Sequence, residues 1–340
     1  MSGKRWAALG IAAFLFVFSL LFSGVTSFFF NNDEDKAGTF SKMMSFEDDG
    51  SLDETIIEDG DATQKIAVLD VEGVIQDSGD ASSVFSSSSY NHRSFLKQLD
   101  KVKDDPDIAG AVIRVNSPGG GVVESAEVYD KIQQVKKETK KPIYVSMGAT
   151  AASGGYYISA PADKIYASPE TMTGSLGVIM QGYNYEKLAK KLGIETVTIK
   201  SGPYKDIMSP TREMTKEEKE ILQGMLNSSY DQFVKIIADG RGMTEEQVRK
   251  IADGRIYSGR QAKEIGLIDD FGYLDDVTAA MKKKIKHNDA MIVRYSESTG
   301  FGSLFSMASQ KLLGEKMALS KMMDSVSNTT SPRLMYLYAE

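Results

Sequence analysis

Ser153 has the sequence surroundings of an enzyme nucleophile. It lies within the small-residue string ATAASGGYY, which follows an apolar run typical of a strand. A serine flanked by alanine and glycine at a strand-to-helix turn is accessible to a substrate, and the backbone amide of Gly154 is placed to stabilise an oxyanion. The same residues fit a small-residue helix packed tightly against a sheet, so the string alone leaves both interpretations open.

A second turn of this kind contains three consecutive glycines. The string NSPGGG ends at Gly121 and lies between an expected strand and an expected helix. Backbone N–H groups at such a turn form an anion or oxyanion site, although three glycines can also serve simply to supply positive φ angles. The chain contains neither a GxGxxG dinucleotide pattern nor a GxxxxGK(S/T) phosphate loop.

A serine nucleophile requires a base, and the composition restricts which residue can supply it. The 340-residue chain contains no cysteine and two histidines, His92 and His287. The absence of cysteine excludes disulfides, thiolate nucleophiles and cysteine-based metal clusters. Both histidines lie in polar surroundings that are unpromising for catalysis, which leaves a lysine or a carboxylate. A lysine serves as a base when burial favours its neutral form, as in serine-lysine variants of the triad.

The elements that must position these residues alternate between strands and helices. Apolar or β-branched runs predict strands over residues 66–75, 111–116, 143–147, 165–168 and 196–200. Helical patterns lie between them at residues 94–102, 123–139 and 185–192. This alternation predicts an α/β fold with largely parallel strands. An added helical layer is expected from four further helices, two of which begin with a capping box, at residues 215–240, 244–252, 258–265 and 273–284.

The N-terminal part of the sequence predicts a single transmembrane helix. Residues 6–30 carry no charge, and about 20 apolar residues span a bilayer. Lys4 and Arg5 precede this run and acidic residues follow it, so the positive-inside rule places residues 1–5 in the cytoplasm and the rest of the chain outside. A cleaved signal peptide is the alternative, but the apolar run exceeds the usual length of a signal-peptide core.

An acidic, flexible tether is expected between the anchor and the folded domain. Residues 31–63 contain eleven acidic and two basic side chains and show little apolar periodicity. Such a segment cannot bury enough apolar surface to order itself. The folded domain is expected over residues 64–300, since 41% hydrophobic residues suffice for a buried core. A net charge of −7 does not suggest a nucleic-acid-binding protein.

Four ordered motifs resemble the bacterial signal peptide peptidase A family. They are NSPGG (116–120), AASGGYY (151–157), TGSLGV (173–178) and SGPYKDIMSP (201–210). The resemblance implies a spiral of ββα units of the crotonase and caseinolytic protease kind. It also implies a dyad in which Ser153 is the nucleophile, Lys205 is the general base and Ser175 is a hydroxyl that orients the lysine. The amides of Gly120 and Gly154 would form the oxyanion hole.

The same resemblance implies a homo-oligomer. Some family members carry two such units in tandem, with the serine and the lysine in adjacent units, whereas this chain carries one. A single-unit chain would complete its dyad across a subunit boundary in a closed ring. The implied activity is endopeptidase hydrolysis through an acyl-enzyme, acting on remnant signal peptides in the bacterial cell membrane. No cofactor and no metal are expected.

The tail, residues 301–340, lies outside the common motifs and ends in the apolar string SPRLMYLYAE. Chain ends are commonly frayed or loosely docked. This string also resembles a peptide substrate, so a second hypothesis is that the tail occupies the groove of the enzyme as a self-inhibitor or a cleavage product.

Two other functions fit parts of the pattern. A crotonase-type enzyme would use glycine amides to hold the oxyanion of an acyl-coenzyme A thioester, although such thioesters are cytoplasmic and the charge pattern places this domain outside. A catalytically silent membrane scaffold would keep the ring and would have no need for Ser153, Lys205 and Ser175 together.

Overall fold

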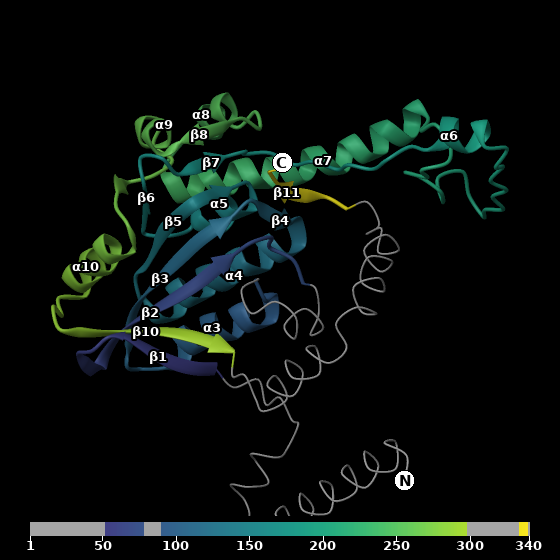
Figure 1. Ribbon diagram of the computed structural model, residues 1–340. Helices are drawn as coiled ribbons and strands as arrows, with labels where there is room; N and C mark the ends of the chain where they lie inside the picture. The colour runs from purple at the N-terminus through teal and green to yellow at the C-terminus, as the bar shows by residue number, and fades with distance from the viewer. Residues whose placement is uncertain (1–51, 78–89, 298–332, 339–340) are drawn as a thin grey trace, which may run out of the picture. The chain divides into compact units, whose positions relative to one another are not determined.

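A largely parallel sheet forms the core of the part of the chain that the structure describes (Figure 1). The computed structural model describes residues 52–77, 90–297 and 333–338. Within these residues the sheet has the order β1-β10-β2-β3-β5-β6-β9, with β7 beside β5 and β8 beside β7. Its strands are β1 (Leu52–Glu58), β2 (Asp61–Glu72), β3 (Ile108–Ser117), β5 (Ile143–Ala152), β6 (Lys164–Ala167), β7 (Met172–Gly174), β8 (Ile256–Ser258), β9 (Asp270–Phe271) and β10 (Ala290–Glu297). The pairings are parallel except β1 with β10 and β7 with β8, which confirms the α/β prediction.

The helices lie close to the positions that the sequence predicts. They are α3 (His92–Asp104), α4 (Val122–Thr139), α5 (Gly154–Ser159), α6 (Glu186–Lys191), α7 (Lys216–Arg241), α8 (Glu245–Ile251), α9 (Gly259–Glu264) and α10 (Leu274–Ile285). The two predicted capping boxes are formed, with Thr215 at the start of α7 and Thr244 at the start of α8. Each one satisfies amide groups that a helix start would otherwise leave unpaired.

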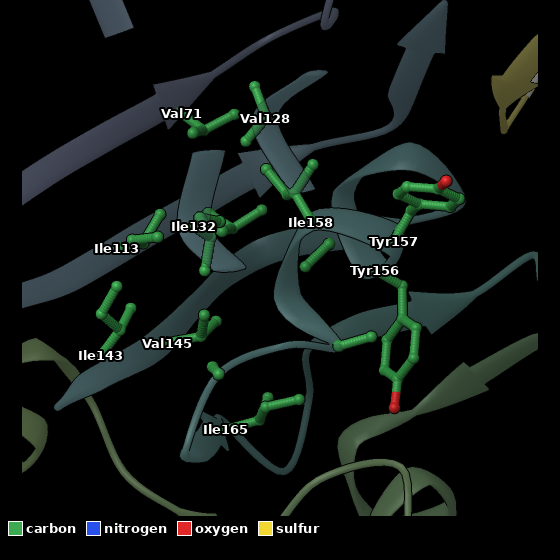
Figure 2. Close-up of a cluster of buried hydrophobic side chains, with 14 of the residues drawn as sticks. Val71, Ile113, Val128, Ile132, Ile143, Val145, Tyr156, Tyr157, Ile158 and Ile165 are labelled. Carbon is green, nitrogen blue, oxygen red and sulfur yellow. The ribbon is translucent and has the colours of Figure 1, made fainter. Parts of the chain in front are cut away.

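Side chains that alternate along the central strands pack into two separate layers. On β2, Leu69 belongs to the same cluster as Phe95 of α3 and Ile132 of α4, whereas Ile66 belongs to a second cluster with Met281 of α10. Figure 2 shows part of the first cluster. The central strands are therefore buried on both faces, which explains why their sequences are nearly continuous apolar runs.

Residues 52–58 and 61–63 lie in strands of the sheet, which corrects the prediction that the acidic tether extends to residue 63. β1 pairs with β10, and β2 begins at Asp61. Lysines from neighbouring elements offset the acidic charge: Lys65 Nζ donates to Glu54 at 2.8 Å, and Lys282 Nζ donates to Glu58 at 2.9 Å. The rest of the predicted tether and the predicted transmembrane segment, residues 6–30, lie outside the described residues. Among the residues that are described, no helix is long and apolar enough to span a bilayer.

The predicted strand at residues 196–200 is not formed. These residues lie in a segment that we call the arm, residues 183–215, which contains α6. Val197 is 86% exposed and Ile199 is 97% exposed. Figure 1 shows α6 beyond the N-terminal end of α7, away from the central sheet. A β-branched run without a neighbouring strand has no partner for its backbone hydrogen bonds, so the local preference of these residues is not realised.

Candidate active site

Ser153 and Ser175 follow two strands that end next to each other. β5 ends at Ala152 and β7 ends at Gly174, and these two residues are partners in the parallel ladder. The backbone amide of Ser153 donates a hydrogen bond to the carbonyl of Gly174 at 2.8 Å. The sequence predicts that the strand before Ser153 ends at residue 147. In the structure this strand continues through Ala152, so the serine stands directly at its end.

Ser153 combines a strained backbone with a buried hydroxyl. Its φ is 52° and its ψ is −114°, a combination that residues other than glycine rarely adopt. The residue is 1% exposed, and its Oγ has no hydrogen-bond partner among the described residues. A buried hydroxyl without a partner costs about 1–3 kcal/mol. Strain at a serine between a strand and a helix is typical of the turn that presents a nucleophile.

The glycine turn forms the short strand β4 (Gly119–Gly121), which lies against the start of α5. A methyl group added at Gly154 would lie 3.0 Å from the nitrogen of Gly120, and one added at Gly119 would lie 2.6 Å from the nitrogen of Gly154. Gly119 also has a φ of 101°, which favours glycine. These contacts bring the amides of Gly120 and Gly154 close together beside Ser153, an arrangement that suits the binding of an oxyanion.

The structure does not bring Lys205 to Ser153 within one chain. Lys205 is exposed in the arm, and Figure 1 shows the arm separated from β5 and α5 by much of the length of α7. His92 does not replace it. Contrary to the polar loop expected around it, His92 is a buried residue of α3, with Nδ1 2.7 Å from Tyr90 Oη and Nε2 2.9 Å from Glu127 Oε2. Both of its ring nitrogens are engaged in these contacts.

Arg212 fixes the part of the arm that carries Lys205. Its guanidinium donates to the two carboxylate oxygens of Asp206, at 2.9 and 2.7 Å, and to Glu218 of α7 at 2.8 Å. Arg212 holds the pKa of Asp206 well below its usual range and, with the backbone amide of Thr215, lowers the pKa of Glu218 to about 2. These ion pairs attach the residue next to Lys205 to the start of a long helix.

The arm also exposes many large apolar side chains. They are Tyr183, Tyr185, Leu188, Leu192, Ile194, Val197, Ile199 and Tyr204. Scattered exposed apolar residues are ordinary, but a concentration of them on one projecting segment is typical of a surface that binds a partner. Lys205 lies within this segment.

The last described residues of the chain run through the site as an added strand. β11 (Met335–Leu337) pairs antiparallel with β4, and Tyr336 lies opposite Gly120. On its other side, Met335 exchanges two backbone hydrogen bonds with Ile179, at 2.9 and 3.0 Å. A peptide that adds a strand to exposed backbone edges uses a common mode of peptide recognition, in which main-chain hydrogen bonds supply affinity and pockets supply specificity.

The side chain of Tyr336 fills an apolar pocket next to α5. The residue is 1% exposed, and its ring centroid lies 4.7 Å from that of Tyr157, on which it stacks, and 4.7 Å from that of Phe233. Its hydroxyl donates to the carbonyl of Ser229 at 3.0 Å. This pocket therefore accepts an aromatic ring with a polar tip.

The carbonyl of Tyr336 lies beside the glycine amides. Its oxygen would be 2.0 Å from a methyl group added at Gly119, and that same point is 2.6 Å from the nitrogen of Gly154. Beyond Tyr336 the groove continues into a cavity of about 500 Å³, whose lining includes Ser175, Ile179, Tyr230 and Leu337. The tail thus crosses the site, with a carbonyl group at the glycine turn and residues on both sides of it.

The sequence alone does not indicate the residues that receive the tail. Tyr157 and Phe233 come from two helices that are distant in the chain, and no spacing rule connects them. Ser125 and Ser94 are two further buried serines whose Oγ has no partner among the described residues, and the Oγ of Ser125 would lie 2.7 Å from a methyl group added at Gly154. The position of Ser125 in the helix directly after the glycine turn is the one signal that could have indicated it.

Comparisons with known proteins show the family to which the chain belongs. The profile of peptidase family S49 matches residues 135–288, and that of Clp protease matches residues 81–177. The chain is 40% identical to a candidate signal peptide peptidase SppA of Enterococcus faecium, over 99% of its own length and 95% of the relative. It is 42% identical to a candidate protease of Methanocaldococcus jannaschii, over 62% of the chain and 68% of the relative. It is also 38% identical to Protease 4 of Salmonella typhi, over 54% of the chain and 29% of that protein.

These matches define a serine peptidase, and the α/β fold with its strained serine and glycine turn is consistent with this class. The chain belongs to peptidase family S49. The family resemblance read from the four motifs is thereby confirmed, as is the expectation of a peptidase with a parallel-rich sheet of the Clp protease kind.

Proposed function

We propose that the chain is a membrane-anchored serine endopeptidase that uses Ser153 and Lys205 as a dyad to hydrolyse apolar peptides such as remnant signal peptides. The observation that carries the proposal is the buried Oγ of Ser153, which has no hydrogen-bond partner among the described residues. A nucleophile held in this way needs a base from elsewhere. The name of the E. faecium relative supports signal peptides as the substrate class, and the uncharged run at residues 6–30 supports the anchor in the cell membrane.

The base comes from a second copy of the chain. Lys205 lies on the arm, whose apolar side chains are exposed in a single chain and would be covered by a neighbour. An arm that reaches to the next copy in a closed ring would bring Lys205 to the Ser153 of that copy. Burial at the interface favours the neutral amine that a base requires. Ser175 follows the strand that pairs with the strand of Ser153, and its hydroxyl would accept a hydrogen bond from the lysine and orient it.

The reaction is an acyl transfer. The neutral amine of Lys205 takes the proton of Ser153 Oγ, and the oxygen attacks the peptide carbonyl carbon while the amides of Gly120 and Gly154 hold the oxyanion. The C–N bond then breaks, and Lys205 returns the proton to the leaving amine. A water molecule, activated by the same lysine, attacks the ester carbonyl, which releases the acid and restores Ser153.

The tail acts as a self-inhibitor or as a substrate for self-cleavage. Its strand pairing matches that expected of a bound substrate, and the carbonyl of Tyr336 lies where the scissile carbonyl would be held. The aligned bond is the one between Tyr336 and Leu337. A groove that accepts an extended peptide favours a peptidase over a crotonase-type thioester enzyme and over a silent scaffold, because neither alternative requires such a groove.

Hydrolysis of an internally quenched peptide with the sequence of residues 333–338 tests this function. The full-length protein in detergent is expected to cleave it after the first tyrosine, whereas the Ser153→Ala variant shows no cleavage. Cleavage by the variant at the wild-type rate would show that Ser153 is not the nucleophile. Saturable binding of coenzyme A without peptide hydrolysis would favour the thioester enzyme instead.

A further inference from the structure

Arg333 of the tail is bound in an acceptor pocket at the start of α4. Its Nη1 donates to Glu124 Oε1 at 3.1 Å, and its Nη2 donates to Gln76 Oε1 at 3.2 Å. Glu124 is a largely buried carboxylate, with its side chain 11% exposed, whereas the arginine side chain is 38% exposed. Two acceptors on one guanidinium, of which one is charged, provide charge-assisted hydrogen bonds in a geometry that suits arginine.

Glu124 is held in place by its surroundings independently of Arg333. The backbone amide of Asp77 donates to Glu124 Oε1 at 3.3 Å. A methyl group added at Gly121 would lie 1.8 Å from Glu124 Oε2, so glycine at this position lets the carboxylate fold back against β4. Glu124 also lies in the first turn of α4, where the helix dipole favours a negative charge. The acceptor pocket is therefore built into the groove.

The strand pairing fixes the distance between this pocket and the glycine turn. Tyr336 lies opposite Gly120, and three residues earlier in the tail Arg333 reaches Glu124. Between them the carbonyl of Leu334 accepts a hydrogen bond from the amide of Val122 at 3.4 Å. A substrate held in the same register places its own side chain at this position over Glu124, whatever its sequence.

We propose that Glu124 and Gln76 form a cation subsite, which selects peptides with an arginine or lysine three residues before the residue whose carbonyl is held at the glycine turn. This inference rests on the proposed function, since it takes the tail as a guide to how substrates bind. Arginine is preferred over lysine because its two N–H groups reach both acceptors, whereas the ammonium group of lysine is a point charge. The enzyme thus recognises a positive charge followed by an apolar, aromatic segment.

Peptide binding to the full-length Ser153→Ala variant measures the subsite without catalysis. The probes are a fluorescently labelled Arg-Leu-Met-Tyr-Leu-Tyr peptide and versions with lysine, alanine or glutamate in the first position. The tail competes equally with all of them, so ratios of affinity are unaffected by it. The substitution Glu124→Gln is then added to the Ser153→Ala variant. It removes the negative charge of the side chain and keeps an oxygen that accepts the hydrogen bond from the Asp77 amide. The matched control is Glu127→Gln, one turn along the same helix, where the glutamate contacts His92 instead.

The arginine peptide is expected to bind about tenfold more tightly than the alanine peptide, with the glutamate peptide weakest. Glu124→Gln reduces the ratio to about twofold or less, and Glu127→Gln leaves it unchanged. Equal binding of the arginine, alanine and glutamate peptides, or a ratio insensitive to Glu124→Gln, would overturn the subsite. The ratio of kcat/KM for the same peptides, measured on the enzyme with Ser153 intact, separates the two proposals. Arginine-dependent binding without hydrolysis would support the subsite and contradict the peptidase. Hydrolysis at the same rate whatever the first residue would support the peptidase and contradict the subsite.

Discussion

Tyr336 lies opposite Gly120 in the ladder between β11 and β4, with its carbonyl beside the glycine amides and its ring stacked on Tyr157. A single residue of the tail thus occupies both an apolar pocket and the place of a reacting carbonyl. Burial of the ring fixes the position of the carbonyl, because the pairing of β11 with β4 leaves the backbone of Tyr336 little conformational freedom. A substrate would be aligned at Ser153 by the same combination of main-chain pairing and side-chain burial.

Removal of residues 333–340 should raise activity. The tail is an intramolecular competitor for the groove, and a tethered segment reaches effective concentrations in the millimolar range. We expect the turnover of a short peptide at low substrate concentration to rise about tenfold in the truncated chain. Initial rates measured against the full-length protein, at equal concentrations of active sites, check this.

The full-length Tyr336→Asp variant is the control for that truncation. A carboxylate in the pocket of Tyr157 and Phe233 would be buried without a cation, so the tail should leave the groove and the rate should rise as it does on truncation. Rates equal to the wild type in both variants would show that the tail does not compete with substrate.

Gly119→Ala should abolish most of the activity and lower the melting temperature, because alanine is strained at the φ of 101° of this position. The added methyl group would lie 2.6 Å from the nitrogen of Gly154 and would meet a bound peptide carbonyl at the position of Tyr336 O, 2.0 Å away. We expect kcat to fall about a hundredfold, as for the loss of an oxyanion donor. Gly224→Ala, in α7 with nothing within 4 Å of the added group, is the matched control and should keep full activity. Thermal melting of both variants distinguishes a site effect from unfolding, and normal activity in Gly119→Ala would contradict the oxyanion assignment.

The order of the arm should depend on pH only in the acid range. Because Arg212 lowers the pKa of Glu218 in the folded chain to about 2, below the value near 4.5 expected after unfolding, the ion pair stabilises the arm fully above pH 4.5. This stabilisation is lost as the pH falls from there towards 2.

Hydrogen exchange of peptides from the arm, corrected for intrinsic rates, measures that dependence. Protection should stay constant from pH 7 to about 5 and decline below 4.5. The Arg212→Met variant should lose protection at every pH and should show a lower kcat, because the segment next to Lys205 is no longer attached to α7. The same exchange profile in this variant as in the wild type would show that Arg212 does not order the arm.

Much of the core and of the serine turn can be predicted from the sequence, because local signals decide them. The apolar runs of β2, β3 and β5 and the capping boxes at Thr215 and Thr244 are formed as expected. The strand predicted at residues 196–200 fails because β-branched residues need a neighbouring strand, and the arm has none among the described residues. The acidic strand β1 is not predicted because its stabilising contacts come from the folded structure: it pairs with β10, and Lys282, which contacts Glu58, is distant in the sequence.

Some residues of the candidate site can also be predicted from local sequence signals, and others cannot. The local strings indicate Ser153 and the glycines, because each lies at a turn of small residues after an expected strand, whereas Ser175 is indicated by the family resemblance alone. Tyr157, Phe233 and Glu124 need the three-dimensional structure, since their roles depend on how the tail lies in the groove. Lys205 is indicated by the family resemblance, and in a single chain its position is far from the serine, so its role is a prediction about the assembly.

Complementation between two inactive variants tests the central claim most directly. Full-length Ser153→Ala and Lys205→Ala are each expected to be inactive on the peptide of residues 333–338. After the two are unfolded together and refolded in detergent, about one quarter of the sites should combine an intact serine from one copy with an intact lysine from its neighbour, so about a quarter of the wild-type activity should return. A mixture that stays as inactive as its components, although it assembles like the wild type, would contradict a dyad shared between copies.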